Sequence, residues 1–187
     1  MRLATLCLTC CCLSTLSLPL SAQVPPVTKP AEEVSADSVQ IAGITFKTGG
    51  AWKSKPARAM TAAIFSIDAK GSDKPLDVVF YFFGAGQGGS APDNIARWKK
   101  QFDGDPKGGS EEIPVGEETV RIVDFTGTYM DGVPMGPKTP KAHYRLLGAI
   151  VPGKDGSVFL KLTGPEDAVG AVKDAFKALA TSPFAKK

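Results

Sequence analysis

The segment GAGQGGS, residues 84–90, holds a G-x-G-x-x-G pattern at Gly84, Gly86 and Gly89. Such a loop can hold a phosphate on backbone N–H groups when it joins a strand to the N-terminus of a helix. A dinucleotide site also requires a parallel strand that ends in an acidic residue about 20 positions later. Residues 103–107 occupy that place, and their Gly, Asp and Pro content predicts a loop. We therefore interpret the glycines as a flexible turn, and we predict no nucleotide or other cofactor.

A helix is predicted directly after this turn. The segment SAPD, residues 90–93, supplies a capping serine, a first-turn proline and the aspartate of a capping box. Ile95, Trp98 and Phe102 then recur at three- and four-residue steps, which predicts an apolar stripe packed on a sheet. Gly104 is placed to end the helix.

Asn94 and Arg97 lie three residues apart, on one face of the predicted helix. Two roles are open for them. They can hydrogen-bond the glycine loop or a neighbouring strand as part of the scaffold, or they can bind a ligand or a partner protein near the loop. We take Asn94 and Arg97 as the candidate binding residues, and we predict no catalytic residue and no metal site.

Other residues that could do chemistry are few. His143 is the single histidine, which excludes a metal site built on several imidazoles. Together with Met130 and Met135 it could bind Cu(I), which prefers soft thioether ligands. The paired glutamates at 111–112 and 117–118 predict a solvated loop rather than an acid–base pair, which needs desolvated, opposed carboxyl groups.

The N-terminus predicts export. Arg2 precedes the apolar, Leu-rich residues 3–20, and LSA at residues 20–22 is a small-residue cleavage pattern. We assign residues 1–22 to a secretory signal peptide and expect a secreted or periplasmic protein with no stable membrane insertion after cleavage. A retained membrane anchor is the open alternative. All four cysteines lie in this segment, so cleavage would leave a chain without thiols or disulfides.

The remaining chain divides into two parts. Residues 23–38 are rich in Pro, Val, Ala and Glu without periodicity, which predicts a flexible leader. Residues 39–187 are long enough to form a single domain with its own core. The formal net charge of +3 and the lack of a basic stripe argue against nucleic acid as a partner.

Short apolar runs separated by turn signals predict about six strands, at residues 39–46, 60–67, 76–83, 119–128, 143–151 and 157–162. The run at 76–83 is apolar on both faces, as in a strand inside a sheet that is covered on both sides. A second helix is predicted from residues 163–166 to near Pro183. This order predicts an α+β fold, with a mainly antiparallel sheet and two principal helices packed on it.

A resemblance to a known group supports this architecture. The residues that carry it are Trp52, Pro56 and the segments 58–60, 88–98 and 158–165. Their combination resembles a group of exported bacterial proteins of unknown function, common in planctomycete-type bacteria, from about Val39 onward. The element order also resembles the PsbP-like fold, shared by extrinsic subunits of photosystem II and a Ran-binding nuclear import factor. That likeness implies an antiparallel sheet between helices and a role in binding rather than catalysis, while no motif carries over photosystem or Ran binding.

These observations lead to one expected function and one alternative. We expect an exported, non-catalytic binding or accessory protein of the cell envelope, with an envelope protein as its partner. The alternative is a small-molecule-binding protein or an enzyme that uses a pocket near the loop of Gly84–Gly89.

Overall fold

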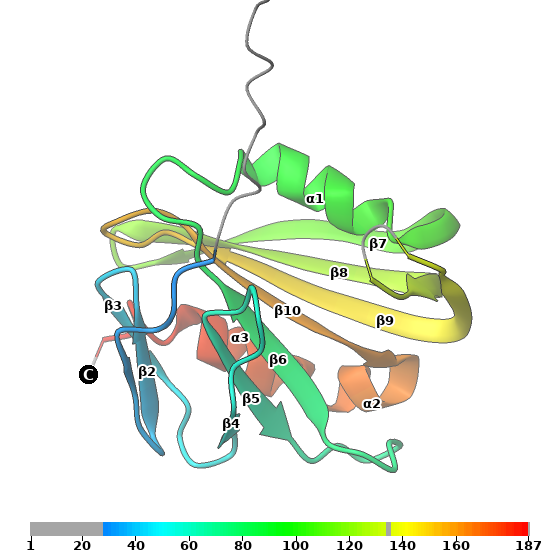
Figure 1. Ribbon diagram of the computed structural model, residues 1–187, viewed down its shortest axis with the longest axis horizontal. Helices are drawn as coiled ribbons and strands as arrows, with labels where there is room; N and C mark the ends of the chain where they lie inside the picture. Colours follow the sequence, from blue (N-terminus) through cyan, green and yellow to red (C-terminus); the bar gives the residue numbers. More distant parts are fainter. Residues whose placement is uncertain (1–27, 134–135, 187) are drawn as a thin grey trace, which may run out of the picture.

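Seven strands form one antiparallel sheet in the order β4-β5-β6-β10-β9-β8-β7 (Figure 1). Their bounds are β4 Lys53–Lys55, β5 Ala63–Ile67, β6 Leu76–Tyr81, β7 Phe102–Val115, β8 Glu118–Asp131, β9 Thr139–Val151 and β10 Val158–Pro165. This computed structural model describes residues 28–133 and 136–186. Every neighbouring pair of strands in the sheet is antiparallel.

The remaining elements cover the two faces of this sheet. They are a three-stranded antiparallel sheet, β1 Glu33–Val34, β2 Ser38–Ile41 and β3 Ile44–Lys47, and three helices, α1 Ala91–Lys99, α2 Glu166–Ala171 and α3 Lys173–Thr181. Helix α1 lies on one face, whereas α2, α3 and the small sheet lie on the other (Figure 1). The large sheet is therefore apolar on both sides along much of its width.

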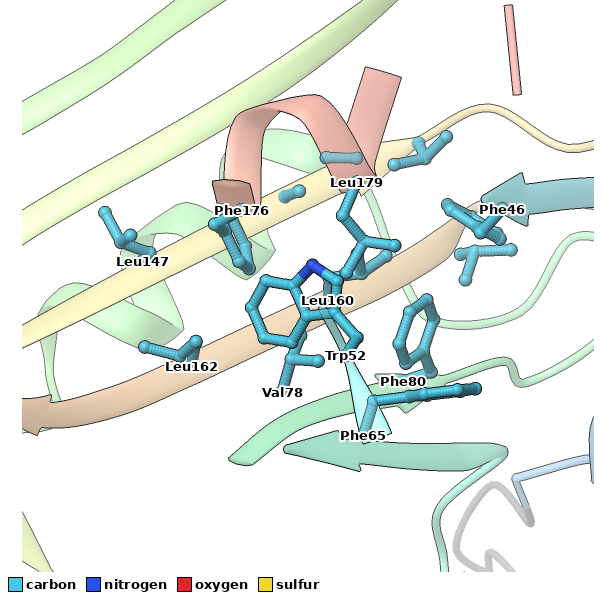
Figure 2. Packing of buried hydrophobic residues seen from close by; sticks show 14 of the residues in the cluster. Phe46, Trp52, Phe65, Val78, Phe80, Leu147, Leu160, Leu162, Phe176 and Leu179 are labelled. Carbon is cyan, nitrogen blue, oxygen red and sulfur yellow. The ribbon is translucent and has the colours of Figure 1, made fainter. Parts of the chain in front are cut away.

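The larger core fills the face covered by α2, α3 and the small sheet. Figure 2 shows Phe46, Phe65 and Phe80 meeting there with Leu160 and Phe176. The ring of Phe80 makes edge-to-face contacts with Phe46 at 5.2 Å and with Phe65 at 5.9 Å between centroids. Such pairs stabilise a core beyond their buried area. The small sheet is therefore part of the same folded unit as the large one.

A second, smaller core lies under α1. Trp98 is only 6% exposed, and its neighbours there include Phe102, Phe125 and Leu146. Its indole packs against the sheet at Gly148 on β9, where an added Cβ would lie 2.5 Å from the ring. The missing side chain at Gly148 is therefore what lets α1 pack this closely.

The predicted α+β class with a mainly antiparallel sheet is confirmed, and α1 and α3 pack on that sheet. Five of the six predicted strands lie in the large sheet, and the sixth, at 39–46, lies in the small one. The large sheet also contains β4 and β7, which were not predicted, and β7 runs through residues predicted as loop. Helix α1 ends at Lys99, so the prediction that Gly104 ends it was wrong, and Gly104 lies within β7. Strand β7 is polar because it is an edge strand whose side chains are mostly exposed, and pairing with β8 holds it in the sheet.

Two further segments differ from the sequence prediction. The run at 39–46 is a hairpin rather than one strand, because Ala42 and Gly43 form its turn with φ of 55° and 70°. Positive φ at both turn positions fits the twist of a hairpin. The turn was not predicted because its first residue is alanine rather than the usual Asn, Asp or Gly. The second helix is divided at Val172, whose φ of −109° and ψ of 8° separate α2 from α3.

The N-terminal predictions fall partly outside the described residues. The signal peptide of residues 1–22, with all four cysteines, lies outside them, as does the leader up to residue 27. From residue 28 onward the assigned leader pairs with the fold: Lys29 N donates to Phe82 O, Ala31 N donates to Ala62 O, and β1 pairs with β2. Among the described residues, no helix is both long and apolar enough to cross a membrane.

The contact between α1 and Gly148 can be tested by substitution. Gly148→Ala is expected to lower the free energy of unfolding by about 1 to 3 kcal/mol, because the new methyl group collides with the Trp98 ring. Gly109→Ala on β7 is the control, since a Cβ at Gly109 meets nothing within 4 Å. Urea unfolding of both variants measures the difference, and equal stability of the two would contradict the packing described.

Candidate functional site

A cleft of about 460 Å³ lies between α1 and the neighbouring part of the sheet. Its floor comes from β6 and β10, its wall from the inner side of α1, and its end from β8 and the β8–β9 connection. Trp98 lies in the wall and fixes it in place through its contact with β9. The cleft is of the size that small-molecule sites in proteins have.

Aromatic side chains make the floor. Tyr81 and Phe83 point the same way because side chains alternate along an extended chain, and their rings stack at 6.4 Å with an angle of 10°. Phe159 of β10 lies beside them, 5.9 Å from Phe83 between ring centroids. All three are in contact with the smaller core, so the floor is rigid as well as apolar.

Lys161 is the one charged side chain of the floor. Its neighbours on β10, Leu160 and Leu162, face the larger core, so alternation turns Lys161 toward α1. Its ammonium donates to Gln101 Oε1 at 2.5 Å and to the Tyr129 hydroxyl at 2.8 Å. The Tyr129 hydroxyl in turn donates to Gln101 Oε1 at 3.0 Å. A carbonyl oxygen, a phenol and an ammonium therefore meet at one end of the cleft.

Burial shifts the titration of both ionisable groups in this trio. It lowers the pKa of Lys161 to about 8, against the attraction of Asp131 and with a small further lowering from Lys138. Burial also raises the pKa of Tyr129 to about 12, helped by Asp131 and Tyr81. At neutral pH the lysine is therefore mostly charged and the phenol is neutral.

The two residues singled out by the sequence both line this cleft. Asn94 is 3% exposed, and its Nδ2 donates to Gly88 O at 2.8 Å and to Ser90 O at 2.9 Å. Arg97 is exposed and lies next to the same loop, 3.6 Å from where a Cβ at Gly89 would stand. Asn94 therefore holds the glycine loop against the start of α1, whereas the guanidinium of Arg97 is accessible at the mouth of the cleft.

The glycine loop itself has the geometry of a turn that supports the cleft. Strands β6 and β7, on either side of α1, are separated by β10, β9 and β8 in the sheet. A dinucleotide unit needs neighbouring parallel strands, so this arrangement does not have that form. Gly88 has a φ of 90°, and a Cβ there would lie 2.7 Å from the Phe159 ring. The loop is therefore glycine-rich at this point because it passes directly over the aromatic floor.

Sequence reasoning missed Lys161, Gln101 and Tyr129. One signal was present, since VFLKLTG, residues 158–164, places a single lysine inside an otherwise apolar strand. A charge at such a position is buried unless the strand lies at an edge, and buried charges require partners. Its partners are Gln101, which follows α1, and Tyr129 on β8. The sequence alone does not show that these residues lie close to Lys161.

The opposite face holds a second charged cluster, around Asp124. Its carboxylate accepts hydrogen bonds from Arg145 Nε and Lys173 Nζ, both at 2.7 Å. Burial pushes the pKa of Asp124 up, but the hydrogen bonds from Lys173 and Arg145 outweigh it and lower the pKa below its usual value. In the depression of about 480 Å³ beside these residues, Asp124 is therefore already paired with two cations of the lining. We assign the cluster to the scaffold, where it ties α3 to the sheet.

The other candidates for chemistry are separated or exposed. Glu111 and Glu112 lie on β7 rather than in the predicted loop, where they pair with Lys177 and Arg121. Met130 lines the cleft and His143 is exposed on β9, while Met135 lies outside the described residues, so the structure does not test the Cu(I) alternative. In the part of the chain that the structure describes, no three His, Cys, Asp or Glu side chains lie close enough to hold a metal ion.

Comparison with known proteins assigns no family. No protein family matches the chain, and no curated protein is significantly similar to it.

Asn94 and Arg97 are expected to respond differently to substitution. Asn94→Ala should lower the free energy of unfolding by about 1 to 3 kcal/mol, because two carbonyls lose a buried donor. Arg97→Ala should change it by less than about 0.5 kcal/mol, because the side chain is exposed. Thermal and urea unfolding measure both effects, and a large loss of stability in Arg97→Ala would place that residue in the scaffold.

Lys161 is expected to reduce stability at neutral pH. Because its pKa falls from 10.5 in the unfolded chain to about 8 in the fold, folding carries the full cost of the buried charge below pH 8. Lys161→Met should therefore be more stable than the parent by about 1 to 3 kcal/mol at pH 7. The gain should shrink as the pH rises from 8 to 10.5, where the parent lysine loses its charge in the unfolded chain too.

Urea unfolding of the parent and Lys161→Met across this pH range measures the difference. A variant that is less stable than the parent at every pH would show that Lys161 stabilises the fold.

Proposed function

We propose that the chain is an exported, non-catalytic binding protein of the cell envelope, and that it binds a small molecule in the cleft beside α1. The observation that carries the proposal is the combination of a rigid aromatic floor with a buried ammonium, Lys161. Small-molecule sites have this composition, with apolar walls and a few fixed polar groups. Export is the part of the proposal that rests on residues 1–22.

The loss of stability caused by burying the charge of Lys161 supports a binding role for the cleft. A buried cation without a carboxylate partner destabilises the fold, and groups of this kind gather at functional sites. Among the described residues, the salt bridges of the protein do not include Lys161. A ligand that meets this cation would explain why an apolar residue does not stand there.

The architecture and the partner also belong to the proposal. We assign the arrangement of the antiparallel sheet between helices to the PsbP-like fold, in keeping with a binding role. The dimensions of the cleft favour a small molecule over a protein surface as its occupant. An envelope protein can still dock elsewhere on the chain, as an accessory role requires.

Binding of a neutral aromatic probe tests this function. We expect the purified protein to bind N-phenyl-1-naphthylamine saturably at one site, seen as an increase in probe fluorescence. Phe83→Ala should weaken binding by about tenfold, because it removes one of the rings of the floor.

Val34→Ala is the matched control, because Val34 is an apolar side chain of β1 that is 48% exposed and lies outside the cleft. Thermal unfolding of each variant shows that it remains folded. Failure of the parent to bind, or an equal effect of the two substitutions, would contradict the proposed site.

A further inference from the structure

We propose that the cleft selects small organic anions that carry a planar aromatic group, with the anionic oxygens on Lys161 and the ring on the floor. This inference rests on the proposed function and adds the chemical class of the ligand. Carboxylates and sulfonates both present anionic oxygens that can accept a hydrogen bond from the Lys161 ammonium.

The charged side chains that line the cleft are all cations, and Asp131, which is not part of the lining, partly offsets the charge of Lys161. Lys161, Arg97 and Lys138 line it, and its described lining contains no Asp or Glu. Lys138 lies at the end, where its ammonium donates to Gly132 O and Val133 O. Arg97 is exposed at the wall, so the two flexible cations stand near the opening and Lys161 stands inside. A one-sign lining with low-dielectric walls attracts ligands of opposite charge.

Lys161 retains a donor for such a ligand. A lysine ammonium has three N–H donors. Among the described residues, two of them are used, on Gln101 Oε1 and on the Tyr129 hydroxyl. Those two acceptors are neutral, so they orient the ammonium without neutralising it. An anion placed on the remaining donor would gain a charge-assisted hydrogen bond and offset the cost of burying the cation.

The floor specifies the other half of the ligand. Tyr81 and Phe83 present a stacked pair of rings, and Phe159 lies next to them. A planar ring placed on these side chains gains the offset or edge contacts that aromatic groups prefer. The cleft volume of about 460 Å³ suits a ligand of one or two rings rather than a long chain.

A matched pair of fluorescent probes tests this selectivity. 1-Anilinonaphthalene-8-sulfonate and N-phenyl-1-naphthylamine share one aromatic skeleton and differ by the sulfonate. We expect the sulfonate to bind about tenfold more tightly at pH 6.5, as a hydrogen bond to a charged group contributes. Lys161→Met should remove this preference and retain binding of the neutral probe. Lys107→Met, which removes a cation from the depression beside Asp124, should leave the preference unchanged.

The pH dependence gives a second readout that needs no variant. The groups that face Lys161 are Gln101, Tyr129 and Asp131, with Lys138 at the end of the cleft and Tyr81 on β6. Burial raises the pKa of both tyrosines, so they stay neutral around pH 8, where the lysine loses its charge. Sulfonate affinity should therefore fall by about tenfold between pH 6.5 and 9.5 while neutral-probe affinity stays constant.

Each outcome has one meaning. If neither probe binds, the proposed function fails and the selectivity fails with it. If both probes bind equally well and Lys161→Met changes neither affinity, the binding function stands and the anion selectivity is overturned. A sulfonate preference that survives Lys161→Met but is lost in Lys107→Met would move the anion site to the opposite face and also overturn the inference.

Discussion

The indole of Trp98 lies on the bare backbone of Gly148, and the position of α1 depends on this contact. A helix of nine residues is too short to be stable alone, so packing must hold it. Because Trp98 of α1 packs against β9, the inner side of α1 forms one wall of the cleft, and β6 and β10 form its floor. The position of the cleft therefore depends on the glycine at 148, which allows Trp98 to pack on β9.

Lys161 gives this cleft, whose floor is otherwise aromatic, a buried positive charge. Strand β10 lies inside the sheet, and both of its faces are covered, so a charge there has little access to water. Gln101 and Tyr129 satisfy two of its donors but supply no negative charge. The buried cation beside aromatic side chains therefore lowers the stability of the fold. Binding sites commonly reduce stability in this way.

The sequence predicts what depends on local spacing and misses what depends on distant pairing. The placing of Asn94 and Arg97 on one helix beside the glycine loop was predictable, because helical neighbours can be counted along the chain. Strand β7 was missed because an edge strand with one exposed side needs few apolar residues. Lys161 was missed because its partners lie 60 and 32 residues away in the chain, at Gln101 and Tyr129. Only the order of strands in the sheet brings these three together.

The most direct test of the central claim is an NMR titration of Lys161 with carbon-13-labelled lysine side chains, assigned by comparison with Lys161→Met. We expect a titration midpoint of about 8 in the free protein. Saturating 1-anilinonaphthalene-8-sulfonate should raise this midpoint, since a bound anion favours the charged form. A midpoint near 10.5 in the free protein, or one that the bound sulfonate leaves unchanged, would contradict a buried ammonium that binds anions.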